Sequence, residues 1–317
     1  MPEYARIAGM QSAGALVVLK KGGTHMSSWV LQATGKVRDI FEDAENKRVM
    51  LVASDHVSAF DEILPVEIPD KGKILTQISG FWFRKTEGIA PNAFITCDDN
   101  EISTSGLTGT FSKRCTVMKK LKMLPIEAIV RGNITGSLWK AYLDGAREFC
   151  GEHLWEGLRK SESLPSPIFT PTTKAPIGEH DQNLTFEEMI KHIEKAGFED
   201  AEFIATRVRD YSLELFKFAR RYAWNHGIIL ADSKFEFGID ENGIIILGDE
   251  LLTPDSSRFW KLDDFEIGKE PPSMDKQIIR DWIKDHEGEK KIPGKVLQLT
   301  RGRYLECYER LTGERFE

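Results

Sequence analysis

Short runs of apolar and β-branched residues, separated by turn residues, mark the first part of the chain. They cover residues 29–32, 48–53, 93–96 and 116–120, and such runs are typical of β-strands. Between them, residues 74–85 carry apolar side chains three to four positions apart, which is the period of an amphipathic helix. The pattern therefore predicts a β-rich N-terminal lobe with one helix.

The second part of the chain mixes strands with longer helices. Thr185 followed by Glu188 is a capping-box sequence, in which each side chain bonds the backbone amide of the other residue at the start of a helix. We expect that helix to end near Gly197, because glycine commonly follows a helix. Further helices are predicted at residues 200–225, 274–286 and 293–311.

These elements predict an α+β fold with two lobes. The β-rich N-terminal lobe spans residues 27–124, and an α+β lobe spans residues 125–317. Residues 1–26 differ in composition from the rest and are expected to be a disordered leader.

Composition and charge narrow the class of protein. The chain has 317 residues, 41% of them hydrophobic, and a net charge of −7, which argues against disorder and gives no basic surface for nucleic acid. Its longest apolar runs are far shorter than the roughly 18 residues of a membrane span. Four cysteines without a CxxC pair argue against a disulfide scaffold or a zinc cluster. We therefore expect a cytoplasmic enzyme that binds neither nucleic acid nor membrane, as a monomer or small homo-oligomer.

A predicted hairpin carries the first candidate site. Two β runs, 228–239 and 244–251, flank Asn242 and Gly243, which favour a two-residue type I′ turn. That turn would place Glu236 directly opposite Asp249 on one face of the sheet. Two carboxylates so close repel unless a cation lies between them, and Mg²⁺ prefers such oxygen ligands. The hairpin thus predicts a magnesium site.

The same hairpin face carries further polar residues. A period of two places Asp232 and Lys234 on the face of Glu236, with apolar side chains on the opposite face. We interpret this face as the floor of a site, and the alternative is a solvated outer face.

Two glycine-containing segments are further candidates. Gly35, Lys36, Val37 and Arg38 form a short basic loop suited to phosphate, although such tight turns are common and the loop is no Walker A motif. Its structural alternative is an ordinary turn.

The second segment holds Arg131 and Ser137 among glycines, and it is suited to a sugar phosphate or carboxylate, the alternative being a plain loop. Arg258 is a second candidate for an anion-binding guanidinium. His56 and His180 are candidate hydrogen-bond donors, although single histidines more often have structural roles.

Six stretches of the chain, in order, resemble the SAICAR synthetase family of purine biosynthesis, in its larger, yeast-like branch. They are GKVRDIFE (35–42), SDHVSAFDE (54–62), KGKILTQISGFWFR (71–84), PIEAIVRGNITGSLWKAYL (125–143), PIFTPTTKAPIGEHDQNL (167–184) and ADSKFEFGIDENGIIILGDELLTPDSSRFWK (231–261). Two departures stand out: His56 replaces the arginine usual in the family, and Asn133 stands where an aromatic residue is frequent.

The resemblance implies a fold and a reaction. The fold has two lobes with ATP in the cleft between them, and its N-terminal lobe is distantly like that of protein kinases. The reaction joins the carboxylate of carboxyaminoimidazole ribotide (CAIR) to the amine of L-aspartate, and it converts ATP to ADP and phosphate through an acyl phosphate. The required cofactor is Mg²⁺. Two alternatives are another ATP-dependent small-molecule kinase and an inactive nucleotide-binding module.

The resemblance also implies roles for individual residues. Gly35, Lys36, Val37 and Arg38 lie over the ATP phosphates, Met123 and Leu124 meet adenine at the hinge between the lobes, and Lys174 approaches the nucleotide phosphates. CAIR is bound by Arg131, Ser137 and Arg258, with Ser58 and Asp61 near the amino-acid end. Lys234 and Asp232 are the expected catalytic residues, with Asp232 as the base for the amine, and Glu236 and Asp249 hold the metal.

Overall fold

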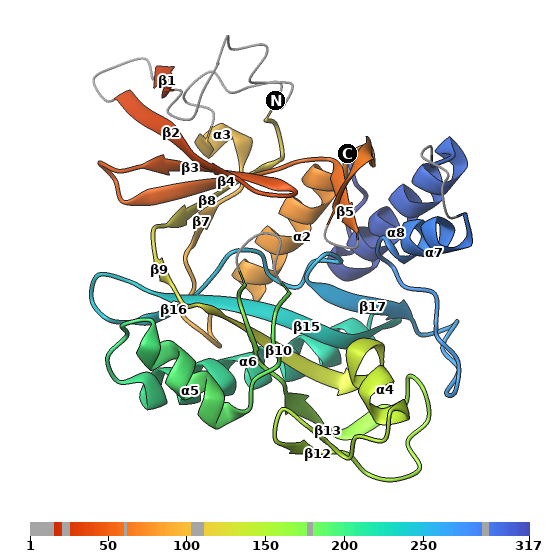
Figure 1. Ribbon diagram of the computed structural model, residues 1–317. Helices are drawn as coiled ribbons and strands as arrows, with labels where there is room; N and C mark the ends of the chain where they lie inside the picture. Colours follow the sequence, from red (N-terminus) through yellow and green to blue (C-terminus); the bar gives the residue numbers. More distant parts are fainter. Residues whose placement is uncertain (1–15, 21–25, 60–61, 103–110, 176–179, 287–291) are drawn as a thin grey trace.

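The computed structural model describes residues 16–20, 26–59, 62–102, 111–175, 180–286 and 292–317 (Figure 1). The N-terminal part contains the following elements: β1 (Leu16–Lys20), β2 (Met26–Thr34), β3 (Arg38–Asp43), β4 (Arg48–Ala53), β5 (His56–Ala59), β6 (Glu62–Glu67), α2 (Lys71–Lys85), β7 (Phe94–Thr96), α3 (Asp99–Ile102), β8 (Cys115–Lys119) and β9 (Lys122–Met123). The rest contains β10 (Ile126–Asn133), α4 (Gly136–Leu143), β11 (Glu148–Phe149), β12 (Glu152–His153), β13 (Ser163–Phe169), β14 (Thr172–Thr173), α5 (Phe186–Lys195), α6 (Ala201–Trp224), β15 (Ile228–Ile239), β16 (Ile245–Gly248), β17 (Ser257–Lys261), α7 (Gln277–Asp285) and α8 (Gly294–Thr312).

An antiparallel sheet of six strands forms the N-terminal lobe, in the order β1-β2-β3-β4-β8-β7. Part of the predicted leader takes part in it, because strand β1 pairs with β2; residues 1–15 and 21–25 lie outside the described residues. One face of the sheet has its own apolar core, which includes Trp29, Phe41 and Met50. The β-type runs read from the sequence therefore do form a β-rich lobe.

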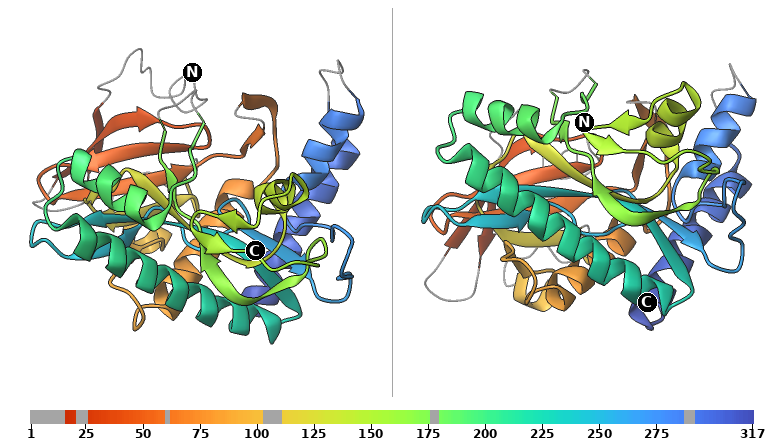
Figure 2. Two further views of the ribbon diagram at one scale, coloured as in Figure 1. Left: turned by 60° about the horizontal axis from the view of Figure 1, so that its bottom comes forward. Right: turned by 90° about the horizontal axis from the view of Figure 1, so that it is seen from below.

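A second sheet forms the C-terminal lobe, with the central order β13-β10-β15-β16 and with β9, β14 and β17 beside it. Helix α6 runs across one face of this sheet (Figure 2). Its buried side chains, such as Ile204 and Val208, recur at the helical period and join the main core. The opposite face of β10 and β15 carries polar side chains.

Helix α2 connects the two sheets. Its buried residues Ile74, Ile78 and Trp82 belong to the same core as the β15 and α6 side chains, and it packs against α8 (Figure 1). The helix predicted at 74–85 is thus present, and it begins three residues earlier. The capping box of Thr185 and Glu188 is also confirmed, with both reciprocal hydrogen bonds formed.

The predicted register of the β15–β16 hairpin is wrong by one residue. Glu236 pairs with Gly248 instead of Asp249, and the loop has three residues, 241–243, instead of two. Asp249 follows the end of β16 and has a left-handed backbone, with φ of 53°.

The side chain of Asp240 explains this loop. Its carboxylate accepts hydrogen bonds from the backbone amides of Asn242 and Ile244, each at 2.9 Å. The amide of Asp240 itself donates to the carbonyl of Ile244, and Gly243 closes the loop with φ of 78°. An aspartate that bonds the backbone two residues on favours a turn of this kind, and this overrode the preference of Asn-Gly for a tighter one.

Candidate active site

One face of the C-terminal sheet gathers the predicted polar residues. Asp232, Lys234 and Glu236 are half-buried on β15, whereas the residues between and after them are buried on the other face. The period-two prediction is therefore confirmed. We call this surface the site face and define it by six residues: Glu127 and Arg131 of β10, Asp232, Lys234 and Glu236 of β15, and Arg258 of β17.

Charges on the site face pair across strands. Lys234 Nζ donates to both oxygens of Glu127, at 2.7 and 2.8 Å. Burial lowers the pKa of Lys234, but Glu127 outweighs it and the net shift is upward. Glu127 belongs to none of the candidate motifs of the sequence. Its position four residues before Arg131 on one strand is the signal that places both on the same face.

Arg131 is almost fully buried and is held by three partners. Its Nε donates to Thr170 at 3.0 Å, one terminal nitrogen donates to Ser137 at 3.2 Å, and the other lies 3.7 Å from Asp232. Burial lowers the pKa of Arg131, with Asp232 opposing the shift. The structure therefore brings Arg131 and Ser137 together, as the shared segment predicted.

Arg258 approaches Asp232 from the other side. Its Nη1 lies 3.1 Å from Asp232 and donates to Thr135 Oγ1 at 3.0 Å. Arg131 and Arg258 therefore share the Asp232 carboxylate. A side chain at Gly136, where φ is +57°, would put a Cβ atom 2.9 Å from the same Arg258 nitrogen.

The N-terminus of α4 opens beside these arginines. Thr135 precedes the helix but makes no capping hydrogen bond, because its hydroxyl contacts Arg258 and Glu270. No acidic residue occupies the first turn of α4. Uncapped amide groups at a helix N-terminus form a ready anion site.

Glu236 and Asp249 remain neighbours despite the shifted register, because Glu236 pairs with Gly248, the residue before Asp249. Glu236 forms an ion pair with Lys174, and the charge of Lys174 is also stabilised by Asp249. Burial and the charge of Asp249 raise the pKa of Glu236 to about 7. Such repulsion fits a pair of carboxylates that shares a cation. Within the described ranges, no three histidine, cysteine, aspartate or glutamate side chains gather as a metal cluster.

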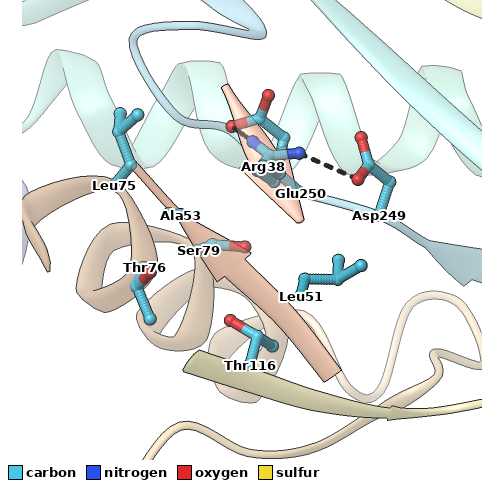
Figure 3. A pocket seen from close by; sticks show the side chains of 9 residues that line it. All are labelled: Arg38, Leu51, Ala53, Leu75, Thr76, Ser79, Thr116, Asp249 and Glu250. Carbon is cyan, nitrogen blue, oxygen red and sulfur yellow. Dashed lines mark hydrogen bonds and ion pairs between the residues drawn. The ribbon is translucent and has the colours of Figure 1, made fainter. Parts of the chain in front are cut away.

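Arg38 reaches the end of β16 from the N-terminal lobe. It donates to Asp249 at 2.8 Å and forms a second ion pair with Glu250 (Figure 3). These three side chains form the polar end of a small pocket whose other walls come from β4, β8 and α2. Arg38 of the basic loop therefore contacts Asp249, a candidate magnesium ligand, directly.

The loop from Gly35 to Arg38 is a tight turn between β2 and β3. The Gly35 amide donates to the Arg38 carbonyl at 2.7 Å, and a Cβ atom at Gly35 would lie 2.9 Å from that oxygen. The Val37 carbonyl accepts from the Ser54 amide at 2.9 Å, which fixes the loop to the chain after β4. Lys36 lies in this turn.

The hinge candidates Met123 and Leu124 lie beside β15. Met123 is opposite Gly238, and the Leu124 amide donates to the Phe237 carbonyl at 2.8 Å. Hydrogen-bonded and non-hydrogen-bonded positions alternate in an antiparallel pair, so the backbone groups of Met123 point away from β15. The amide of Leu124 is already used within the protein.

Ser58 and His56 lie on a separate hairpin, formed by β5 and β6. Ser58 is on β5, which pairs only with β6 in the described part of the chain, and Asp61 lies outside the described residues. His56 lies 3.5 Å from Glu67 on that hairpin. Asn133 donates to the Ser161 carbonyl at 2.9 Å and so has a structural role. The sequence pattern alone does not distinguish a structural role of Asn133 from a role in substrate binding.

Two further results concern the surface. A wide hollow over the turn between α5 and α6 is lined by Glu194, Phe198 and Phe203, none of them a predicted site residue. None of the described helices combines the length and the apolar character needed to cross a membrane.

Comparison with known proteins identifies one family. The family model described as SAICAR synthetase matches residues 31–295. Phosphoribosylaminoimidazole-succinocarboxamide synthases from Lachnospira eligens and Methylobacillus flagellatus are each 47% identical to the chain; the matches cover 89% of it and 95% and 94% of those proteins.

Solved structures give the same result. The SAICAR synthase of Saccharomyces cerevisiae complexed with SAICAR matches with a TM-score of 0.80 and 37% identity, over 91% of this chain and 96% of that one. A SAICAR synthetase in complex with ADP matches with a TM-score of 0.66 and 25% identity, over 90% and 99%. The family model, the relatives and the α+β fold agree: the chain belongs to the SAICAR synthetase family.

Proposed function

We propose that the protein is an ATP-dependent ligase that joins the carboxylate of CAIR to the amine of L-aspartate. The products are SAICAR, ADP and phosphate, a step of purine biosynthesis. Family membership supports this reaction, as do the related structures that contain SAICAR and ADP. The observation that carries the proposal is the site face, where two arginines share Asp232 beside the carboxylates of Glu236 and Asp249.

The chemistry explains the need for ATP. A carboxylate is a poor acyl donor because its oxygen is a bad leaving group. One carboxylate oxygen of CAIR therefore attacks the γ-phosphorus of ATP, and ADP leaves. The amine of aspartate then attacks the acyl carbon of this acyl phosphate, loses a proton, and expels phosphate. The protein's part is to position the reactants and neutralise their charge.

CAIR is expected at the end of the site face near α4. Arg131, Arg258 and Ser137 surround the uncapped first turn of that helix, and a phosphate or carboxylate there would meet both guanidinium groups and backbone amides. Asp232 keeps the two arginines close together before the substrate arrives.

ATP is expected at the other end, between the lobes. Lys36 and Arg38, in the turn of Gly35 and Val37, would meet the phosphates, with Lys174 on the opposite side. Met123 is the better hinge contact for adenine, since the amide of Leu124 is already bonded to Phe237. This arrangement supports an ATP cleft between the lobes, with a kinase-like N-terminal lobe as part of the proposal.

Glu236 and Asp249 are the residues that would hold Mg²⁺. Burial, and next the charge of Asp249, raise the pKa of Glu236 to about 7, and two interacting carboxylates of this kind fit a divalent cation. When bound, Mg²⁺ neutralises the charge of the transferring phosphate.

Lys234 lies between Asp232 and Glu236 and would contact the reacting carboxylate or phosphate. Asp232 as the base for the amine, and Ser58 and Asp61 as contacts of the amino acid, stay predictions. The biosynthetic role of the family supports a cytoplasmic location, and a monomer or small homo-oligomer is expected.

An ADP-release assay tests the proposal. CAIR, L-aspartate and Mg²⁺ are each omitted in turn, and release is expected only when all three are present. ADP release without aspartate would instead indicate a small-molecule kinase on the same scaffold. Equal turnover with L-glutamate would contradict the assigned acceptor.

A further inference from the structure

Asp255 is a buried carboxylate outside the site face. Its side chain is only 5% exposed, and it belongs to the segment that joins β16 to β17. Burial alone would raise the pKa of Asp255, but Lys276 and Lys71 lower it far below its usual range. The charged form of Asp255 is therefore strongly favoured in the folded protein.

Three elements distant in sequence supply the partners of Asp255. Lys71, fully buried at the start of α2, lies 2.8 Å from one carboxylate oxygen. Tyr304 of α8, also fully buried, donates its hydroxyl to the other oxygen at 2.7 Å. Lys276, just before α7, lies 3.6 Å from that second oxygen. The carboxylate thus joins α2, α7 and α8 at one point.

The segment around Asp255 connects the two ends of the proposed active site. On the nucleotide side, the Asp255 amide donates to the Thr253 hydroxyl at 3.2 Å, and that hydroxyl donates to Glu250. Glu250 in turn forms an ion pair with Arg38. The carboxylate anchor is therefore three contacts away from the residue expected over the ATP phosphates.

On the substrate side the connection is shorter. The backbone carbonyl of Ser256, next to Asp255, accepts a hydrogen bond from the backbone amide of Lys234 at 2.8 Å. Ser257 and Ser233 pair across β17 and β15, with their hydroxyls 2.9 Å apart. Arg258 follows directly. A displacement of Asp255 would move the strand that carries Arg258 and the loop that carries Glu250 together.

We propose that Asp255, Lys71 and Tyr304 form a positioning anchor that holds the segment 250–258 in register with both halves of the active site. None of the three is among the residues assigned above to CAIR, ATP or Mg²⁺. Through this anchor, helix α8 also helps to position the active-site residues, because the hydroxyl of Tyr304 holds Asp255 in the segment 250–258. This inference rests on the proposed ligase function for its kinetic consequence, although the anchor itself is a property of the free protein.

Tyr304→Phe is the sharpest variant, since it removes one hydroxyl and keeps the buried ring. Tyr308→Phe is the matched control: it lies on the same helix, is nearly buried, and its hydroxyl bonds Glu314 instead of the anchor. Lys71→Met is a second variant, which removes the charge from the α2 side and keeps a side chain of similar length.

The first measurement needs no activity. Hydrogen–deuterium exchange of the ligand-free protein, read on peptides covering residues 250–258, is expected to be about tenfold faster in Tyr304→Phe than in wild type or Tyr308→Phe, because a charge-assisted hydrogen bond is lost. Unchanged exchange in both Tyr304→Phe and Lys71→Met overturns the anchor.

The second measurement is steady-state kinetics well below the unfolding temperature. Tyr304→Phe is expected to lower kcat/KM about tenfold for CAIR and for ATP alike, since a small misplacement of reacting groups is costly. Faster exchange with unchanged kcat/KM for both substrates overturns the positioning role. A wild-type protein that makes no SAICAR overturns the proposed function, and the exchange result then still decides the anchor.

Discussion

Arg38 and Asp249 lie 211 positions apart and form a hydrogen bond of 2.8 Å. The bond joins the basic turn of the N-terminal lobe to the end of β16, so a residue expected over the ATP phosphates contacts a residue expected to hold Mg²⁺. Arg38 also pairs with Glu250, and both acids stabilise its charge. In the free protein, Arg38 therefore partly neutralises the negative charge of Asp249 and Glu250.

Asp249→Asn tests this relationship. Burial raises the pKa of Asp249, but Arg38 and Lys174 lower it further, so the charged form is favoured. We expect the variant to lose about 1–3 kcal/mol of stability without ligand, as for a lost hydrogen bond between charged groups. Stabilisation by Mg·ATP should largely vanish, since it scales with affinity. Thermal unfolding with and without Mg·ATP measures both effects.

Glu241→Gln is the control for that variant. Glu241 is exposed in the loop of the same hairpin, where it pairs with Lys47. Its Mg·ATP shift should equal that of wild type. A normal shift in Asp249→Asn would remove Asp249 from the metal site.

Arg131→Lys tests the substrate end of the site face. A lysine cannot reproduce the planar guanidinium that contacts Thr170, Ser137 and Asp232 together. We expect CAIR binding to weaken by ~1–3 kcal/mol, with ATP binding little changed. Calorimetric titration of each ligand measures this, and equal losses for both would move Arg131 out of the CAIR site.

Gly136→Ala tests the helix terminus beside Arg258. The new methyl group would lie 2.9 Å from the Arg258 guanidinium, and the residue has φ of +57°. We expect weaker CAIR binding, by about 1–2 kcal/mol, plus roughly 1 kcal/mol of backbone strain. Gly145→Ala has φ of +96° and open space around it, so it should show strain without loss of CAIR affinity. Equal affinities in both variants would contradict the placement of CAIR at α4.

Asp39 makes the stability of the N-terminal lobe depend on pH. Burial on β3 raises its pKa to about 6, with His56 partly opposing the shift. The folded state then holds the proton more tightly than the unfolded state, so this residue lowers stability as pH rises from about 4 to 6. Asp39→Asn should therefore gain roughly 1–3 kcal/mol over wild type between pH 4 and pH 7.

Asp43, on the same strand, has the opposite effect: it adds stability as pH rises. Although burial raises the pKa of Asp43, hydrogen bonds from Arg48 and Asn46 lower it further. Asp43→Asn should therefore lose stability relative to wild type as pH rises through the acid range toward 4. Urea unfolding across pH 3–8 compares the two variants, and parallel curves for Asp39→Asn and wild type would contradict the shift.

The sequence predicted much of this site because local patterns determine it. The bounds of β15 and the shared face of Asp232, Lys234 and Glu236 follow from a period of two in a strand with one apolar face. Arg131 and Ser137 are six residues apart on one strand-to-helix segment, so local geometry brings them together.

The features that the sequence did not predict depend on particular side chains or on contacts between distant parts of the chain. The hairpin register was set by the Asp240 carboxylate, which the Asn-Gly pattern does not reveal. Glu127 meets Lys234 across two strands that are 107 positions apart in sequence. The anchor of Lys71 with Asp255 spans a still longer separation, so only the assembled core shows it.

The transfer of oxygen tests the central claim most directly. CAIR labelled with ¹⁸O in its carboxylate is incubated with the protein, ATP, Mg²⁺ and L-aspartate, and the products are analysed by mass spectrometry. Activation through an acyl phosphate predicts that each SAICAR formed retains one ¹⁸O and that the released phosphate carries the other. Phosphate without ¹⁸O, or labelled phosphate without formation of SAICAR, would contradict the account.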